Sequence, residues 1–274
     1  MRKLKQKLVG LSTIALLACL ASCQLPQQPD QAPSETARTQ EVRVVTSGGF
    51  AAAYDVLAPG FEEQTGLRLI TAYGSSSGGA VDSIPMRLER GEDFDVIILS
   101  QSSLNNLTER GHVRPDSRTD LVRSSIGMAV REGAEVPDIS TVELFHNTLF
   151  EAESIGYSAS ASGTYLSTVL FPRLGIWEEL APKSQRILSE RVAAVVARGD
   201  VEIGFQQVSE ILPIPGAQFV GPIPAEYQRV TTFSTGIIEG ARNPVGAKQL
   251  VDYLSSTGVV ETIAQTGLEP VAAE

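Results

Sequence analysis

Cysteine, histidine and tryptophan are rare in this sequence, whose 274 residues contain two, two and one of them. Cys19 lies in an N-terminal segment that we expect to be removed, so Cys23 would be the only cysteine left and no internal disulfide could form. His112 and His146 are far apart in the sequence, and no cysteine lies beside either. The scarcity of these side chains argues against a catalytic cysteine, a metal site or a cofactor that they would hold.

Basic residues are also fewer than acidic ones. The sequence contains 22 Lys and Arg and 32 Asp and Glu, which gives a net charge of −10. Removing the four basic residues of the N-terminal segment leaves a net charge of −14. Nucleic-acid binding needs clustered Lys and Arg, so this composition excludes it. An anionic ligand would be repelled at long range and would have to be held by local donors.

The sequence lacks an apolar run of the roughly 20 residues that a membrane-spanning helix needs. Met1–Lys7 is basic and Leu8–Leu20 is apolar, which predicts a signal peptide over residues 1–22 and an exported protein. Leu20-Ala21-Ser22-Cys23 resembles the lipobox of bacterial lipoproteins, which implies a lipid anchor on Cys23 and a protein facing the periplasm or the cell exterior. The alternative is an ordinary cleavage site with a chance cysteine. Residues 23–40, rich in Pro and Gln, predict a flexible tether.

Strand and helix patterns alternate through the rest of the chain. Val42–Val45 and Leu67–Tyr73 predict strands, each followed by a helix, and Phe94–Leu99 is an apolar run typical of a strand buried on both faces. A second series of the same kind begins at Ser125–Val130. This order predicts an α/β protein of two lobes, each a doubly wound sheet. In such sheets ligands bind at the carboxyl ends of the strands.

Turns rich in glycine and hydroxyl groups follow several of these predicted strands. They are Thr46–Gly49, Gly74–Gly79 and Ser154–Tyr165. A turn of this kind before a helix offers unpaired N–H groups and the positive end of the helix dipole to an anion, although a simple capped turn explains any one of them. Their recurrence without a cationic partner predicts an uncharged, hydrogen-bonding cage for a small anion.

Motifs of known hydrolytic and nucleotide-binding enzymes are incomplete. Gly156–Ser160 lacks the final glycine of a nucleophile elbow, and Gly74–Gly79 lacks the lysine of a phosphate-binding loop. Asp93 and Asp95 flank an apolar strand and form no evident acid/base pair. We therefore expect a binding protein and not an enzyme.

Several segments, in their order and spacing, resemble the molybdate-binding proteins of bacterial ABC importers, which have the type II periplasmic binding fold. The segments are VRVVTSGGF, YGSSS, RGEDFDVIILS, ASGTYLSTVL leading to LGIW, ARGDVEIGFQQ and GLEP. The resemblance implies two lobes joined by two crossover strands, with residues 41–123 and 231–274 in one and residues 124–230 in the other. It also implies an ABC permease as partner and an oxyanion held by serine hydroxyls, backbone N–H groups and a tyrosine.

The family's contacts can be carried over to this sequence with two departures. The first-turn serine falls on Gly49, with Ser47 as a possible substitute, and the tyrosine falls on Gln207. Gln206 and Gln207 either donate to the ligand or simply end a strand. The candidate ligand-binding residues are Ser47, Gly48, Gly49, Ser75, Ser76, Ser77, Ser100, Ser160, Ser162, Gly163, Ser189, Gln206 and Gln207.

The function expected from the sequence is that of a monomeric, lipid-anchored solute-binding protein of an ABC importer. Its ligand would be a molybdate- or tungstate-like oxyanion, held between the lobes by neutral hydrogen bonds. A small organic anion or another oxyanion in the same fold is one alternative. A sensing or surface lipoprotein without a transport role is the other.

Overall fold

The computed structural model describes residues 40–271. The predicted signal peptide, Cys23 and the tether up to residue 39 lie outside the described residues. No helix within residues 40–271 is both long enough and apolar enough to cross a membrane.

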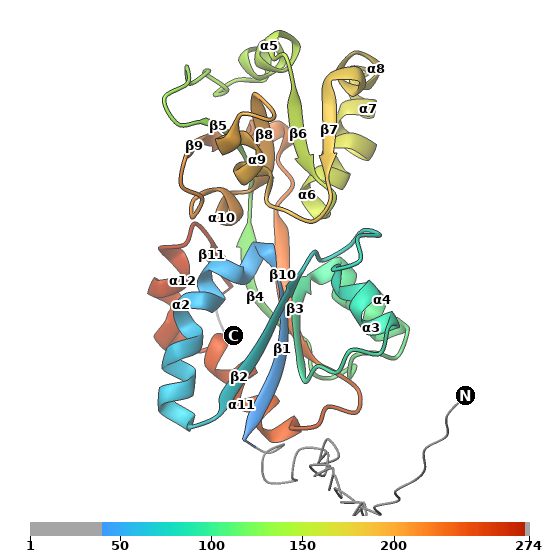
Figure 1. The fold of residues 1–274 in the computed structure, drawn as a ribbon, viewed down its shortest axis with the longest axis vertical. Coiled ribbons are helices and arrows are strands. Elements are labelled where there is room, and N and C mark those ends of the chain that lie inside the picture. The colour runs from blue at the N-terminus through green and yellow to red at the C-terminus, as the bar shows by residue number, and fades with distance from the viewer. Residues whose placement is uncertain (1–39, 272–274) are drawn as a thin grey trace, which may run out of the picture. The chain divides into compact units, whose positions relative to one another are not determined.

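Six strands form the sheet of the first lobe (Figure 1). They are β1 (Glu41–Ser47), β2 (Arg68–Gly74), β3 (Val96–Ser100), β4 (Thr119–Ser124), β10 (Thr231–Ile237) and β11 (Glu269–Pro270). Their order is β11-β4-β10-β3-β1-β2, with β1 parallel to β2 and β3, and β10 antiparallel to β3 and β4. The carboxyl ends of β1, β2 and β3 therefore lie at the same edge of the sheet.

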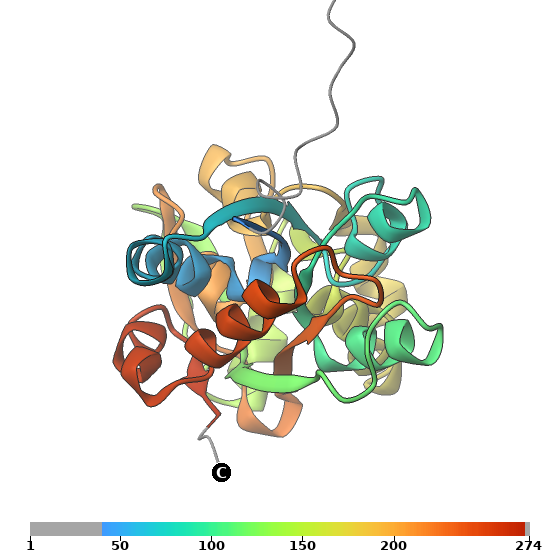
Figure 2. The same ribbon diagram turned by 90° about the horizontal axis from the view of Figure 1, so that it is seen from below.

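Helices cover both faces of this sheet. They are α2 (Gly48–Thr65), α3 (Ile84–Glu89), α4 (Gln101–Glu109), α11 (Pro244–Leu254) and α12 (Val260–Ala264). Val44 points into a core with α2, α11 and α12, whereas its neighbour Val45 packs with α3 and α4. Successive side chains of a strand point to opposite faces, so an apolar run such as β1 supplies both cores. Figure 2 shows α2, α11 and α12 on one side of the sheet and α3 and α4 on the other.

The second lobe is built on a five-stranded sheet of order β7-β6-β8-β5-β9. The strands are β5 (Ile126–Arg131), β6 (Ile155–Ser158), β7 (Ser184–Ile187), β8 (Ile203–Gln207) and β9 (Ala217–Pro222). The helices are α5 (Val142–Glu151), α6 (Ala161–Tyr165), α7 (Phe171–Arg173), α8 (Trp177–Leu180), α9 (Val192–Arg198) and α10 (Val208–Ile211). α6 continues into α7 through a π-helical segment, Leu166–Leu170. One core lies under α5 to α8 and another under α9 and α10, so this sheet too is covered on both faces.

Two short crossovers connect the lobes. β4 ends at Ser124 in the first sheet and β5 begins at Ile126 in the second, while the return passes through residues 228–230 to β10. The amide of Gln207 lies against both crossovers. It is oriented to donate to Ser124 Oγ over 2.9 Å and to accept from Thr231 Oγ1 over 3.1 Å. These bonds tie the end of β8 to both connecting segments.

The predicted fold class, a two-lobed α/β protein with doubly wound sheets, is confirmed. α2 starts at Gly48 and α4 at Gln101, directly after their strands. β4, β7 and β9 were not predicted, since each contains exposed polar positions and carries little apolar signal. The lobe boundaries expected from the sequence, 41–123 with 231–274 and 124–230, stay a prediction.

Candidate functional site

A cavity of about 480 Å³ lies between the two sheets. Its walls are formed where parallel strands end: β1 and β2 of the first lobe, and β6, β7 and β8 of the second. We call it the interlobe cavity. Ten of the thirteen candidate residues line it, namely Ser47, Gly48, Gly49, Ser75, Ser76, Ser160, Ser162, Ser189, Gln206 and Gln207. Their role as ligand-binding residues stays a prediction.

The first wall is the start of helix α2. Ser47 precedes the helix as its N-cap, but its side chain makes no capping hydrogen bond. Its Oγ atom is buried and has no hydrogen-bond partner among the described residues. Buried hydroxyls are nearly always bonded, so an orphan at the edge of a cavity is a group available to a ligand. The N–H groups of the first helical turn lie beside it.

Two further candidate serines hold the turn after β2. Ser75 Oγ donates to the Ser77 carbonyl over 2.8 Å, and Ser76 Oγ accepts from the Ser100 N–H over 3.0 Å. Ser76 therefore keeps its own hydroxyl proton available. Ser77 and Ser100 line a neighbouring cavity of about 310 Å³ that also contains Arg229, not the interlobe cavity.

The wall from the second lobe is the turn between β6 and α6. Ser158 Oγ and Ser162 Oγ lie 3.1 Å apart, and Ser160 is an N-cap without a side-chain capping bond. Gly163 does not line the interlobe cavity. A side chain there would collide with the backbone of Ser158, so its glycine is required for packing.

Residues from both lobes meet across the cavity. Ser189 Oγ of the second lobe donates to Asp82 Oδ1 of the first over 3.2 Å. Gln206 Oε1 accepts from the Ala193 N–H over 3.3 Å, which ties β8 to the first turn of α9. Together with the crossover bonds of Gln207, these contacts occupy some of the side-chain donors and acceptors that we expected a ligand to use.

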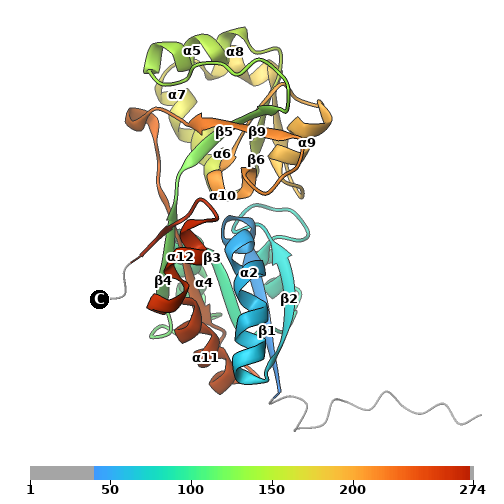
Figure 3. The ribbon, with the colours of Figure 1, turned by 90° about the vertical axis from the view of Figure 1, so that its left-hand side faces the viewer.

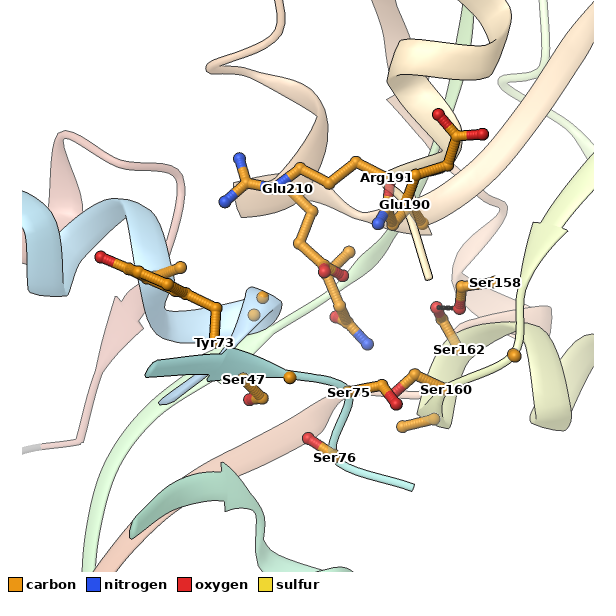
Figure 4. A pocket seen from close by; sticks show the side chains of 18 of the residues that line it. Ser47, Tyr73, Ser75, Ser76, Ser158, Ser160, Ser162, Glu190, Arg191 and Glu210 are labelled. Atoms are coloured by element: carbon orange, nitrogen blue, oxygen red, sulfur yellow. Dashed lines mark hydrogen bonds between the residues drawn. The ribbon is translucent and has the colours of Figure 1, made fainter. Parts of the chain in front are cut away.

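The expected uncharged cage is wrong, because charged side chains line the same cavity. They are Arg191, at the start of α9, and four carboxyl groups, Asp55, Asp82, Glu190 and Glu210. Figure 4 shows the Glu210 side chain in the middle of the cavity, between Ser47 on one side and the Ser158–Ser162 pair on the other. The Arg191 carbonyl accepts from the Ala194 N–H, but within the described range 40–271 the Arg191 guanidinium forms no hydrogen bond or ion pair. The site thus combines hydroxyl donors with one guanidinium group.

Two pKa values at the site are displaced from their ordinary range. Burial raises the pKa of Glu210 to about 7, although Arg191 and hydrogen bonds from Gln206 and the Gln207 backbone act in the opposite direction. Burial, together with the hydrogen bond to the nearby Asp55, raises the pKa of Tyr73 above its ordinary value. At neutral pH Tyr73 is therefore protonated, whereas Glu210 exchanges a proton readily. No group of three or more His, Cys, Asp and Glu in the described part of the chain could hold a metal ion.

Sequence reasoning missed Arg191 and Glu210. Arg191 lies in a polar loop, and Glu210 belongs to α10, a four-residue helix that was not predicted. The signal that could have found Glu210 is its position three residues after Gln207, just beyond the carboxyl end of β8.

Two sheets, two crossovers and a polar cavity between strand ends define the class of two-lobed periplasmic binding proteins. The chain belongs to the family of bacterial extracellular solute-binding proteins, whose family model matches residues 42–269. Members of this class are exported, bind small solutes and work with ABC permeases. The resemblance to molybdate-binding proteins stated from the sequence is confirmed at the level of family and fold.

Known relatives support the family and the fold. The molybdate-binding protein ModA of Azotobacter vinelandii is 25% identical over 239 residues, covering 84% of this chain and 90% of that protein. The solved structure of the periplasmic molybdate-binding protein of Azotobacter vinelandii has a TM-score of 0.67 at 19% identity, covering 85% of this chain and 100% of the other.

A third relative corrects the expectation that the chain is not an enzyme. It is a Pseudomonas sp. protein named aconitate isomerase, 42% identical over 231 residues, which cover 84% of this chain and 88% of that protein. Its name is that of an enzyme, so the absence of hydrolytic motifs was no ground for excluding catalysis. The motifs considered belong to hydrolases and nucleotide-binding proteins, and an isomerase needs none of them.

Proposed function

We propose that this protein binds a small polycarboxylate of the aconitate class in the interlobe cavity and interconverts its cis and trans isomers. The observation that carries this proposal is the composition of the cavity. It combines hydroxyl groups and a helix N-terminus with Arg191 and with a glutamate, Glu210, whose pKa is about 7. The relative named aconitate isomerase, at 42% identity, supports this choice of substrate.

The size of the cavity favours an organic anion. Pockets of roughly 300–1,000 Å³ are typical of sites for small organic molecules, and this one has about 480 Å³. A tetrahedral oxyanion would occupy a small part of that space. A three-carbon chain bearing three carboxylates reaches several walls at once.

Donors are available on several of these walls. One carboxylate can accept from Ser47 Oγ and the first N–H groups of α2, another from the Ser158–Ser162 turn, and a third can pair with Arg191. Hydrogen bonds to a charged group contribute about 1.5–3 kcal/mol each. Such local bonds can outweigh the repulsion expected from a chain with a net charge of −10.

A molybdate-like oxyanion is the second candidate ligand. The observation in its favour is the unpartnered hydroxyl of Ser47 at the start of α2, together with the 25% identity to ModA. For either ligand we propose that Cys23 carries a lipid anchor and that an ABC permease is the partner. The support for the anchor is the Leu20-Ala21-Ser22-Cys23 sequence, and the support for the permease is the family.

The two candidates can be separated with the purified full-length protein. ¹H NMR of the vinyl protons follows the conversion of cis- or trans-aconitate, and thermal shift measures the binding of aconitate, tricarballylate and molybdate. We expect both aconitate isomers to reach the same mixture. Tricarballylate, which has no double bond, should raise Tm and inhibit the conversion. A rise in Tm with molybdate but no conversion of aconitate would favour the oxyanion, and no response to any of these compounds would contradict both candidates.

A further inference from the structure

Glu210 differs from the other carboxyl groups of the interlobe cavity. Asp55 accepts a hydrogen bond from Tyr73, Asp82 accepts one from Ser189, and Glu190 forms an ion pair with Arg198. In the part of the chain that the structure describes, Glu210 forms no ion pair. Its hydrogen bonds come from neutral groups, the Gln206 side chain and the Gln207 backbone. It is therefore the carboxyl group with freedom to gain and lose a proton.

The position of Glu210 is fixed by contacts between the lobes. α10 of the second lobe faces the start of α2 in the first lobe (Figure 3). Ser209 Oγ donates to the Gly49 carbonyl over 2.8 Å, and this bond is buried. The Glu210 carboxyl lies directly against Gly48, so closely that a side chain at Gly48 would collide with it. Glu210 thus lies next to the wall where Ser47 offers its hydroxyl.

The elements packed around α10 contribute few other charges. β8 and β9 contain no titratable residue, and on β5 Arg131 extends toward Gly199. Arg198 of α9 is paired with Glu190 and Asp200. Two charged groups on α2 and α9 share the cavity with Glu210. They are Asp55 of α2 and the unpaired guanidinium of Arg191, which directly precedes α9.

We propose that Glu210 is the catalytic base of the isomerisation and carries one proton between the two ends of the substrate's allylic unit. This inference rests on the function proposed above. A substrate carboxylate held by Ser47 and the start of α2 places the carbon next to it against the Glu210 carboxyl, because that carboxyl packs on Gly48.

The proposed step balances without any other reactant. The Glu210 carboxylate removes a proton from the methylene carbon of aconitate, and the electron pair spreads over the three-carbon unit and its carboxylates. The protonated Glu210 then returns a proton to the carbon at the other end, so the double bond moves by one position. One C–H bond breaks and one forms. The geometry of the new double bond is set by the conformation in which the cavity holds the methylene arm.

The proton affinity of Glu210 suits this role. A general base works best when its pKa lies near the working pH, and that of Glu210 is about 7. The base form increases as pH rises through 7, so kcat/KM should increase over the same range. Arg191 lowers this pKa, and its removal should move the midpoint of the profile to higher pH.

The test uses full-length Glu210→Gln and a matched control, Glu226→Gln, which changes an exposed glutamate of the same lobe. We expect Glu210→Gln to lower kcat by about 10²–10⁴-fold, the usual contribution of a general base. The thermal shift caused by tricarballylate should persist, and Glu226→Gln should behave as wild type. Glu210→Asp, which retains the carboxyl group, should keep more activity than the Gln variant. Arg191→Gln should shift the kcat/KM midpoint upward.

The outcomes separate the two proposals. An active wild type together with a Glu210→Gln variant within fivefold of its kcat would overturn the role of Glu210 alone. A pH profile that Arg191→Gln leaves in place would also contradict it. A wild-type protein that does not convert aconitate would overturn the proposed function and this role with it.

Discussion

Four buried hydroxyl groups in the described residues have no hydrogen-bond partner, and two of them precede helices of the first lobe. Ser47 stands before α2 and lines the interlobe cavity, whereas Ser83 stands before α3 and does not. Neither side chain makes a capping bond. Comparing substitutions of these two serines therefore separates the effect of removing an unbonded hydroxyl from the effect of removing a ligand contact.

Ser47→Ala should leave the free energy of unfolding within about 0.5 kcal/mol of wild type, because no hydrogen bond is lost. It should weaken the binding of tricarballylate by about tenfold or more, since a hydrogen bond to a charged group contributes about 1.5–3 kcal/mol. Ser83→Ala is the control and should change neither quantity. Urea denaturation and calorimetric titration measure the two effects, and equal affinities of Ser47→Ala and wild type would contradict a ligand contact at Ser47.

The residues that line the interlobe cavity were only partly predictable from the sequence. The serine-rich turns were found because hydroxyls and glycines at strand ends form a local pattern. Arg191 and Glu210 were not found, since a charged residue in a loop or a short helix carries no sign of where the fold will place it. Gln207 was a candidate ligand residue because of the resemblance to the family, and nothing in the local sequence indicated that its amide would bond both crossovers. That contact depends on residues far away in the sequence.

Among the secondary-structure elements, α2 is the one on which the site depends. Its first two residues are glycines that contact different partners. Gly48 faces the Glu210 carboxyl of α10, and Gly49 faces the ring of Phe233 in β10. A flexible side chain can move away from an added methyl group, whereas a buried ring in a packed core cannot do so without strain.

Gly48→Ala and Gly49→Ala should therefore have different consequences. Gly48→Ala should fold with little loss of stability but displace Glu210 and lower kcat by tenfold or more. Gly49→Ala should destabilise the protein by about 1–3 kcal/mol, the usual cost of overpacking. Thermal denaturation and the aconitate assay on both variants test this difference. A fully active Gly48→Ala variant would show that the contact with Glu210 is unimportant.

The elements themselves were well predicted where they are apolar and poorly where they are mixed. β1 and β3 are almost completely buried, and their apolar residues indicated strands of a parallel sheet. β7 and β9 lie at the two edges of the second sheet and contain exposed polar residues. Edge strands obtain much of their stability from backbone pairing with a neighbour, which the local sequence does not encode.

For the whole molecule, Glu210 links folding to pH. A carboxyl group whose pKa is raised from 4.5 to about 7 favours the protonated folded state. Between these values the unfolded chain has lost the proton and the folded protein keeps it, so stability falls as pH rises. Above pH 7 the loss of folding stability caused by ionising Glu210 reaches its full value, at most about 3 kcal/mol.

Urea denaturation at several pH values tests this linkage. The stability of wild type relative to Glu210→Gln should decrease between about pH 4.5 and 7 and level off above that range. The variant should thus be the more stable protein at pH 8, by up to about 3 kcal/mol. A constant difference across the range would mean that Glu210 titrates normally and would weaken its assignment as a base.

The hydrogen bond from Ser209 to the Gly49 carbonyl joins the lobes beside the cavity. Any separation of the lobes would have to break this bond, and it would carry α10 and Glu210 away from α2 and Ser47. Loading and unloading would then occur in a form that is chemically silent. Isomerisation would resume only after the lobes close again. Ligand exchange and proton transfer would then occur in different forms of the protein, and a partly bound substrate would not meet Glu210.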